Sequence, residues 1–192
     1  MKNNLSLLLL LSLLYFNYSC NKEDMNPHGL PSATESGENT FGCLINGEPW
    51  IAEIGLGVFD PSIHKIVSYY DEVGVGVSDI YYFSMSAKYV NIEDSIFDIF
   101  SFNFLPVYEA GTFDFSTLSV KDITLSRGQP GMTTNLKIYE LDTLYNNYFN
   151  LTKLDFENNI CSGKFNVRLI DNQNLDTLDI TQGRFDVKYQ PE

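Results

Sequence analysis

Histidine, cysteine and tryptophan are scarce in this sequence, which has 2 His, 3 Cys and 1 Trp in 192 residues. Two isolated histidines cannot supply the usual ligand set of a zinc site, and no cysteine pair has ligand spacing. The Gly-x-Ser-x-Gly elbow of serine hydrolases does not occur either. We therefore expect no catalytic residue set, no bound metal and no cofactor, and we treat an enzymatic role as a minor hypothesis.

Basic residues are also few, because 12 Lys and Arg stand against 25 Asp and Glu, for a formal net charge of −13. They are spread along the chain without a cluster. Nucleic-acid binding requires cations on one surface to neutralise phosphates, and peripheral binding to anionic lipid requires the same. The composition argues against a nucleic-acid partner and indicates an acidic, solvated surface.

One long apolar run is present, at the N-terminus. Leu5 to Phe16 is interrupted only by Ser6 and Ser12 and follows the positive charge of Lys2. A run of about a dozen apolar residues matches a signal peptide and is shorter than the roughly 20 residues of a membrane-spanning helix. Residues 1–19 are therefore predicted to be a signal peptide.

Cys20 follows this run directly and resembles the lipidated cysteine of a bacterial lipobox. Asn17 and Tyr18 depart from the Leu and the small residue that the lipobox usually has at these positions. A plain secretory signal cleaved near Ser19 is therefore an alternative. The resemblance implies a lipoprotein signal peptide and a membrane partner that is reached through the N-terminal lipid.

The charged residues after Cys20 refine this expectation. Lys22, Glu23 and Asp24 resemble the Lys-acidic-acidic export signal of Bacteroidetes lipoproteins that are destined for the outer leaflet. In register with a lipidated cysteine, the pattern implies an outer-membrane protein that is exposed on the cell surface.

The rest of the chain is predicted to be a tether followed by one domain. Residues 20–40 are polar and rich in Pro, Gly and Ser, which is typical of a flexible, lipid-anchored tether. Residues 41–192 consist of short runs of Val, Ile, Tyr, Phe and Thr between turn residues, which predicts strands. The expected strands are 41–46, 49–54, 65–70, 80–89, 96–104, 112–116, 120–126, 135–141, 150–156, 160–170, 175–181 and 183–189.

These strands predict an all-β domain, an antiparallel two-layer β-sandwich, with a partly open β-barrel as the alternative. Asn46-Gly47 is a strong hairpin-turn dipeptide. Segment 96–104 is apolar on both faces and is expected in the middle of the sheet. Residues 142–149 are the one place where a short helical turn is expected.

A Gly-x-Phe-x-apolar pattern occurs three times, beginning at Gly111, Gly163 and Gly183. Each glycine is interpreted as a turn or bulge at the start of a strand, with a structural role.

Cys43 and Cys161 both fall on the expected inward face of their strands. In an exported protein two such residues can form a disulfide, but small buried thiols would show the same pattern. Both alternatives remain open at this stage.

Two segments resemble an uncharacterised family of Bacteroidetes lipoproteins, a domain of unknown function. They are residues 30–50, with an Asn-Thr-Phe-Gly entry and an Asn-Gly turn, and residues 151–189, with Ser-Gly-x-Phe and Gly-Arg-Phe-Asp strands. The resemblance implies a lipoprotein with a β fold and carries no catalytic residues.

Aromatic residues are frequent, at 14% of the chain. The pairs Tyr69-Tyr70 and Tyr81-Tyr82 can each expose one ring. The segment Tyr145, Asn146, Asn147 and Tyr148 is the preferred binding loop, because amphipathic Tyr and adaptable Asn suit recognition surfaces. The segment Asp171-Asn172-Gln173-Asn174 has the oxygen ligands for calcium but is interpreted as a plain turn.

Three Asp-Ser/Thr-apolar tripeptides resemble the O-glycosylation sites of exported Bacteroidetes proteins and would be modified at Ser95, Thr143 and Thr177. The leading functional hypothesis is a cell-surface binding or accessory module for a glycan or protein ligand. The alternatives are a structural envelope protein without a small ligand and, third, a hydrolase with two carboxylates about 5 to 9.5 Å apart.

Overall fold

The computed structural model describes residues 28–54, 66–72, 81–115, 118, 120–129, 136–171 and 173–191. The predicted signal peptide, Cys20 and the segment 22–24 lie outside this part of the chain. The described part contains no helix of membrane-spanning length and hydrophobicity. Its regular structure consists of strands, so the all-β prediction is confirmed.

The strands form one large, mostly antiparallel sheet. In chain order they are β1 (Thr40–Ile45), β2 (Glu48–Ile51), β3 (Glu53–Ile54), β4 (Ile66–Glu72), β5 (Tyr81–Asn91), β6 (Ile96–Leu105), β7 (Gly111–Thr112), β8 (Val120–Gly128), β9 (Lys137–Leu141), β10 (Tyr148–Asp155), β11 (Ile160–Ile170), β12 (Thr177–Lys188) and β13 (Gln190–Pro191). Neighbours along the sheet follow the order β13-β4-β5-β6-β8-β9-β11-β12-β1-β2, with β10 on β11, β7 on β10 and β3 on β5.

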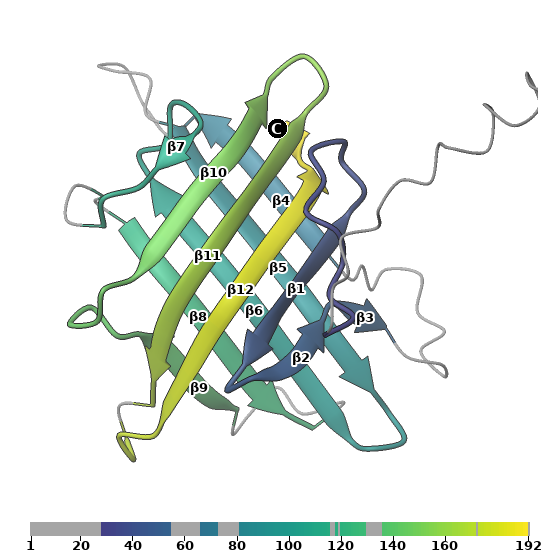
Figure 1. Cartoon of the computed structure of the whole chain (residues 1–192), viewed down its shortest axis with the longest axis vertical. Coiled ribbons are helices and arrows are strands. Elements are labelled where there is room, and N and C mark those ends of the chain that lie inside the picture. Colours follow the sequence, from purple (N-terminus) through teal and green to yellow (C-terminus); the bar gives the residue numbers. More distant parts are fainter. Residues whose placement is uncertain are drawn as a thin grey trace, which may run out of the picture.

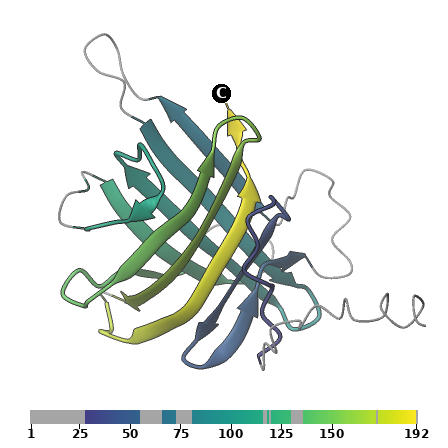
Figure 2. The same ribbon diagram turned by 45° about the horizontal axis from the view of Figure 1, so that its top comes forward.

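The sheet curls into a half-barrel and faces itself across the core. In Figure 1 a front layer of β10, β11, β12 and β1 crosses a rear layer of β4, β5, β6 and β8 at a steep angle. The turned view shows β12 (yellow) bending along its length (Figure 2). The two predicted architectures are thus combined, because the layers face each other as in a sandwich but belong to one continuous sheet.

Two short strands connect the layers. β9 pairs with β8 on one side and with the end of β11 on the other. At the opposite side β13, which follows β12 after a single residue, pairs in parallel with β4. The chain therefore passes from one layer to the other at both sides of the core.

Most strand predictions agree with the structure, and the Asn46-Gly47 turn is confirmed. Both turn residues have positive φ, 52° and 89°, as a type I′ hairpin requires. Segment 96–104 lies in the centre as predicted, because β6 pairs with β5 and β8.

Other predictions about the elements are wrong. The two strands predicted over 175–181 and 183–189 are one strand, β12, which continues through a bulge next to Gln182 (φ 51°). The strand predicted over 112–116 is only the two residues of β7, and 142–149 contains a turn followed by β10 instead of a helical turn. Propensity cannot distinguish these cases, because a bulge and a strand end use the same turn residues.

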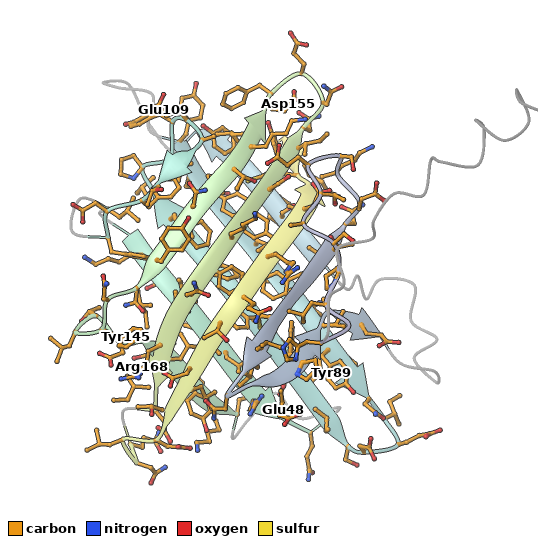
Figure 3. The ribbon with its side chains drawn as sticks, in the orientation of Figure 1. Glu48, Tyr89, Glu109, Tyr145, Asp155 and Arg168 are labelled. Atoms are coloured by element: carbon orange, nitrogen blue, oxygen red, sulfur yellow. The ribbon has the colours of Figure 1, made fainter. Side chains whose placement is uncertain are left out.

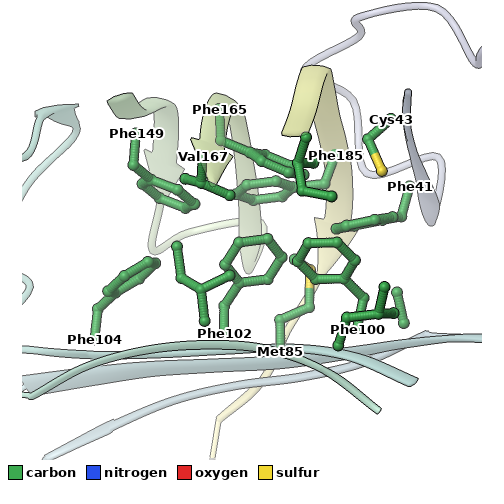
Figure 4. Close-up of a cluster of buried hydrophobic side chains, with 14 of the residues drawn as sticks. Phe41, Cys43, Met85, Phe100, Phe102, Phe104, Phe149, Phe165, Val167 and Phe185 are labelled. Carbon is green, nitrogen blue, oxygen red and sulfur yellow. The ribbon is translucent and has the colours of Figure 1, made fainter. Parts of the chain in front are cut away.

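The core is dominated by phenylalanine. Figure 4 shows rings from the front layer meeting rings from the rear layer. Phe102 of β6 is fully buried, and its ring centroid lies 5.0 Å from that of Phe165 on β11 and 5.5 Å from that of Phe149 on β10. These tilted and edge-on pairs are the arrangements that aromatic quadrupoles favour.

At two of the repeated glycines, a phenylalanine ring occupies the space that a side chain would need. In the antiparallel register of β11 and β12, Gly163 faces Phe185 and Gly183 faces Phe165. A Cβ atom at either glycine would overlap the ring opposite. The interpretation that each glycine starts a strand is correct for Gly111 and wrong for these two, which lie in mid-strand and leave room for a phenylalanine.

The N-terminal part of the domain is attached to the outer side of the front layer through Asp186. The carboxylate of Asp186 accepts hydrogen bonds from Thr34 Oγ1 (2.7 Å), from the backbone N–H groups of residues 36–38 (2.8–3.1 Å) and from Ser162 Oγ (2.8 Å). Burial raises the pKa of this carboxyl, but the hydrogen bonds outweigh burial and hold the pKa below its usual value.

This attachment corrects the predicted domain boundary. The tether was expected over residues 20–40, yet Leu30 is buried, and Thr34 and residues 36–38 are hydrogen-bonded to Asp186. The domain therefore begins at about Leu30. The polar composition was misleading because the segment is held mainly by hydrogen bonds to one buried carboxylate, with Leu30 as its buried apolar side chain.

Cys43 and Cys161 are both buried, as predicted, and both are free. Cys161 faces Val187, whereas Cys43 lies between neighbours that face Arg184 and Thr181, so the two are offset by at least three residues along β12. At 3.3 Å per residue this is about 10 Å, beyond the reach of a disulfide even before the width of β12 is added. The disulfide alternative is wrong, and burial raises the pKa of both thiols.

Candidate functional site

A cleft lined by aromatic rings lies at the end of the half-barrel where β10 turns into β11. Its volume is about 460 Å³, and we call it the aromatic cleft. Its lining residues are Tyr70, Tyr81, Tyr108, Phe156, Asn159 and Tyr189. The same end carries the C-terminus and is at the top of Figure 1.

Tertiary pairing brings these residues together from distant parts of the sequence. Tyr70 is on β4, Tyr81 begins β5, and Tyr189 lies between β12 and β13. The parallel pairing of β13 with β4 puts Gln190 opposite Tyr69 and so places Tyr189 beside Tyr70. Their ring centroids are 5.6 Å apart.

Hydrogen bonds hold the walls of the cleft. The hydroxyl of Tyr70 donates to the carbonyl of Val107 (2.8 Å), and the N–H of Val107 donates to the carbonyl of Tyr81 (2.9 Å). The hydroxyl of Tyr189 donates to the carbonyl of Asp155 (3.3 Å). Burial raises the pKa of Tyr70 and of Tyr189, so both phenols stay neutral at physiological pH.

The rings are arranged as a floor with two rim residues. Tyr70 and Tyr81 are stacked, 5.5 Å apart with an interplanar angle of 9°. Phe156 lies 5.3 Å from Tyr70, and Tyr108 lies 6.4 Å from Tyr81, nearly perpendicular to it. Phe156 and Tyr108 are 56% and 55% exposed, so they offer ring surface to a ligand.

Carboxylates flank the rim residues in the sequence. Glu109 follows Tyr108, and Asp155 and Glu157 stand on either side of Phe156. Figure 3 shows Glu109 and Asp155 at this end of the molecule. A hydrogen bond from the Asn158 side chain, supported by the Asn158 N–H, lowers the pKa of Asp155 to about 2. Asp155 Oδ2 lies 3.3 Å from Lys153 Nζ, whereas Glu109 and Glu157 form no ion pair with the described residues. These two glutamates leave the surroundings of the cleft more acidic than basic, which disfavours anionic ligands.

The predicted binding loop, residues 145–148, lies at the other end. Figure 3 shows Tyr145 beside Arg168, and the guanidinium carbon of Arg168 is 4.1 Å from the ring centroid of Tyr145. Asn147 holds the loop, because its amide donates to the Asp142 carbonyl (2.7 Å) and accepts from the N–H of Arg168 (2.9 Å).

The four residues of this predicted loop do not line one common site. Tyr145, Asn146 and Asn147 line a cleft of about 420 Å³ together with Phe113 and Lys121 among others. Tyr148 begins β10 and lines a separate hollow on the outer side of the front layer. One face of Tyr145 is already covered by Arg168, so this loop offers less free ring surface than the aromatic cleft does.

A third cleft, of about 470 Å³, is polar and contains the segment considered for calcium. The carboxylate of Asp171 accepts hydrogen bonds from Gln173 N–H and Asn174 Nδ2, both at 2.9 Å, and lies 3.7 Å from Lys137 Nζ. Its oxygens are thus used within the turn. No group of three or more possible metal ligands occurs among the described residues.

The three expected O-glycosylation residues are all exposed. Ser95 is in the turn between β5 and β6 (φ 55°), Thr143 is in the loop before β10, and Thr177 begins β12. Each hydroxyl can be reached by a modifying enzyme, and the modification itself stays a prediction.

Sequence reasoning missed the aromatic cleft as a unit. The pairs at 69–70 and 81–82 pointed to two of its residues, and Phe156 gave a signal because it precedes a turn of polar residues. The grouping itself depends on strand pairing over more than 100 residues of sequence. Comparisons with protein-family models, with curated proteins and with solved structures gave no match.

Proposed function

We propose that this protein is a lipoprotein of a bacterial outer membrane, exposed on the cell surface, and that its β domain binds a neutral glycan in the aromatic cleft. The observation that carries the binding role is the pair of half-exposed rings, Phe156 and Tyr108, over a floor of stacked tyrosines. The leader before Cys20 and the segment 22–24 support the location.

A sugar ring suits this cleft chemically. The C–H faces of a pyranose are apolar and pack on aromatic faces, while its hydroxyls need polar partners at the edge. The amide of Asn159 and the hydroxyl of Tyr108 are available there, since neither forms a side-chain hydrogen bond to the described residues. The negative surroundings favour a neutral sugar over a uronate or a sulfated sugar.

The hydrolase alternative has less support. It requires two carboxylates in one cleft, one of them with a raised pKa. No carboxylate is among the described residues that line the aromatic cleft. Glu140 and Asp171 line the polar cleft, but the hydrogen bond from Asn174 lowers the pKa of Asp171, which does not suit a general acid.

Binding can be tested by titrating the domain with neutral oligosaccharides, namely cellohexaose, maltohexaose and mannohexaose, with calorimetry as the readout. We expect binding of at least one of them, a loss of about tenfold or more in Phe156→Ala and in Tyr108→Ala, and no change in Tyr145→Ala. Tyr145→Ala is a matched control, because it removes an exposed aromatic ring at the other end. Loss of binding in Tyr145→Ala alone would move the site to the predicted loop, and no binding at all would contradict the proposal.

The anchor is tested separately in cells. Wild-type protein should incorporate labelled palmitate and sediment with outer membranes, and Cys20→Ser should lose both properties. Replacing Lys22, Glu23 and Asp24 by alanine should keep the lipid but protect the domain from protease added to intact cells. A Cys20→Ser protein that still sediments with membranes would contradict lipid anchoring.

A further inference from the structure

The outer side of the front layer carries two cations that face each other across adjacent strands, Lys164 on β11 and Arg184 on β12. Like charges directly opposite in a sheet destabilise it. The chain has far more acids than bases, so a compensating carboxylate would be easy to place. Neither cation, however, forms an ion pair with a carboxylate of the described chain.

A second pair of opposed cations in the same sheet shows the contrast. Arg127 and Lys137 face each other across β8 and β9. Arg127 Nε lies 3.3 Å from Asp98 Oδ2, and Lys137 Nζ lies 2.8 Å from Asp176 Oδ2. In that pair each positive charge has its own internal counter-ion, whereas Lys164 and Arg184 have no counter-ion among the residues that the structure describes.

The uncompensated pair lines a hollow of about 330 Å³, which we call the cationic hollow. Its other lining residues are Ala33, Tyr148, Phe165, Asn166, Gln182 and Gly183. The bulge in β12 opens the sheet here, because Gln182 has positive φ and its N–H donates to Asn166 Oδ1 (2.8 Å).

Arg184 is held in position before any ligand arrives. Its Nε donates to the carbonyl of Gln182 (3.2 Å), and one terminal nitrogen donates to the carbonyl of Pro31 (3.4 Å). A guanidinium has five N–H donors in a planar fork, so donors remain for a bound oxyanion. The N-terminal segment that Asp186 attaches thus also orients this side chain.

We propose that the cationic hollow binds an acidic sugar, with its carboxylate or sulfate group between Lys164 and Arg184 and its ring against Tyr148. The shared chemistry is an oxyanion on a pyranose. Tyr148 is 41% exposed and supplies the ring surface that a free inorganic anion would not use. This site is separate from the aromatic cleft and does not rest on the function proposed for that cleft.

The test uses the full chain, with hexagalacturonate as the probe in low and high salt. We expect binding that weakens with salt, falls about tenfold in Lys164→Gln and in Tyr148→Ala, and falls further in Lys164→Gln/Arg184→Gln. Arg184→Lys should bind between wild type and the double variant, because it keeps the charge and loses the planar fork.

Lys88→Gln is the matched control, since it removes one cation from β5 of the rear layer and should bind like wild type. Thermal unfolding of each variant reports whether it is folded. Equal loss in Lys88→Gln and Lys164→Gln would show a general charge effect and overturn the proposal. Loss of hexagalacturonate binding in Tyr108→Ala would also overturn it, because that result would place the acidic sugar in the aromatic cleft.

Two further arms distinguish other sources of the oxyanion. Inorganic phosphate should compete with hexagalacturonate only weakly, because it makes no contact with Tyr148. Vesicles of phosphatidylglycerol should not bind. Binding of phosphate or of vesicles that is as strong as binding of hexagalacturonate would contradict an acidic sugar as the ligand.

Discussion

Aromatic rings gather in two regions of this molecule, and the regions differ in how completely the rings are covered. Between the layers, Phe102 is fully buried and has ring neighbours from both layers. In the aromatic cleft, Phe156 and Tyr108 lean against the floor and are more than half exposed. The comparison teaches that the interior rings serve stability, whereas the cleft leaves ring surface that the described part of the chain does not cover.

Polar groups show the same difference. The Asp186 carboxylate is buried and surrounded by donors from residues 34–38 and from Ser162. In the cleft, the Asn159 amide and the Tyr108 hydroxyl have no side-chain hydrogen bond to the described residues. A group in the interior must be satisfied by the protein, while a group in a binding cleft is satisfied by water or ligand.

The largest effect is expected in the interior. Phe102→Ala should lower the free energy of unfolding by about 3–5 kcal/mol, because it removes a ring from the contact between the layers and leaves a cavity. Urea denaturation followed by tryptophan fluorescence measures it, since Trp50 is buried in the same core. A loss below about 1 kcal/mol would mean that the layers can close over the cavity and that the core is less rigid than its packing indicates.

The next effect concerns the buried carboxylate. Asp186→Asn should cost roughly 2–3 kcal/mol at pH 7, because an amide cannot accept all the hydrogen bonds that the carboxylate accepts. The folded-state pKa of Asp186 is lowered, so its contribution is complete above the unfolded pKa of about 3.9 and is lost as the pH falls through the folded pKa.

The pH dependence of stability shows whether the charge of Asp186 is responsible for this loss. The difference in stability between wild type and Asp186→Asn should narrow as the pH is lowered from 7 toward 2, measured by urea denaturation at each pH. Asp179→Asn, at an exposed ion pair with Arg168, should change stability little at any pH. A difference for Asp186→Asn that stays constant down to pH 2 would show that its charge is not what attaches the N-terminal segment.

A smaller effect tests the fit between rings and backbone. Gly183→Ala should cost about 1–3 kcal/mol, because the new methyl group overlaps the ring of Phe165. Phe165→Leu alone also costs stability, but combined with Gly183→Ala it should cost less than the sum of the two, since the smaller side chain removes the overlap. If the losses of stability in the two single variants simply add in the double variant, measured by thermal or urea unfolding, the Phe165 ring is not the reason that position 183 requires glycine.

The smallest effect on stability is expected in the aromatic cleft. Phe156→Ala and Tyr108→Ala should each change the free energy of unfolding by about 1 kcal/mol or less, because the rings are half-exposed before substitution. The same variants should lose the glycan binding proposed above. A large loss of stability in either variant would show that the rings of the cleft contribute to stability as the core rings do.

The sequence predicted the elements that depend on local signals. Alternation in 160–170 and the Asn46-Gly47 dipeptide indicate a strand and a hairpin without further context, and both are present. The continuity of β12 was not predictable, because Gln182-Gly183 resembles the end of a strand in the sequence and is a bulge in the sheet. The aromatic cleft could be predicted only in part, since the positions of Tyr189 and Tyr70 depend on the pairing of β13 with β4.

By itself the sequence determined the all-β class, the inward face of strands with clear alternation such as 160–170, and the tight turn at Asn46-Gly47, because these depend on alternation and on residues that tolerate positive φ. Only the tertiary structure decided which rings are in contact and why positions 163 and 183 have room only for glycine. It also decided that residues from Leu30 onward belong to the domain. These features depend on contacts between different strands, and the pairing of distant strands is decided by the packing of the whole core and not by any local pattern.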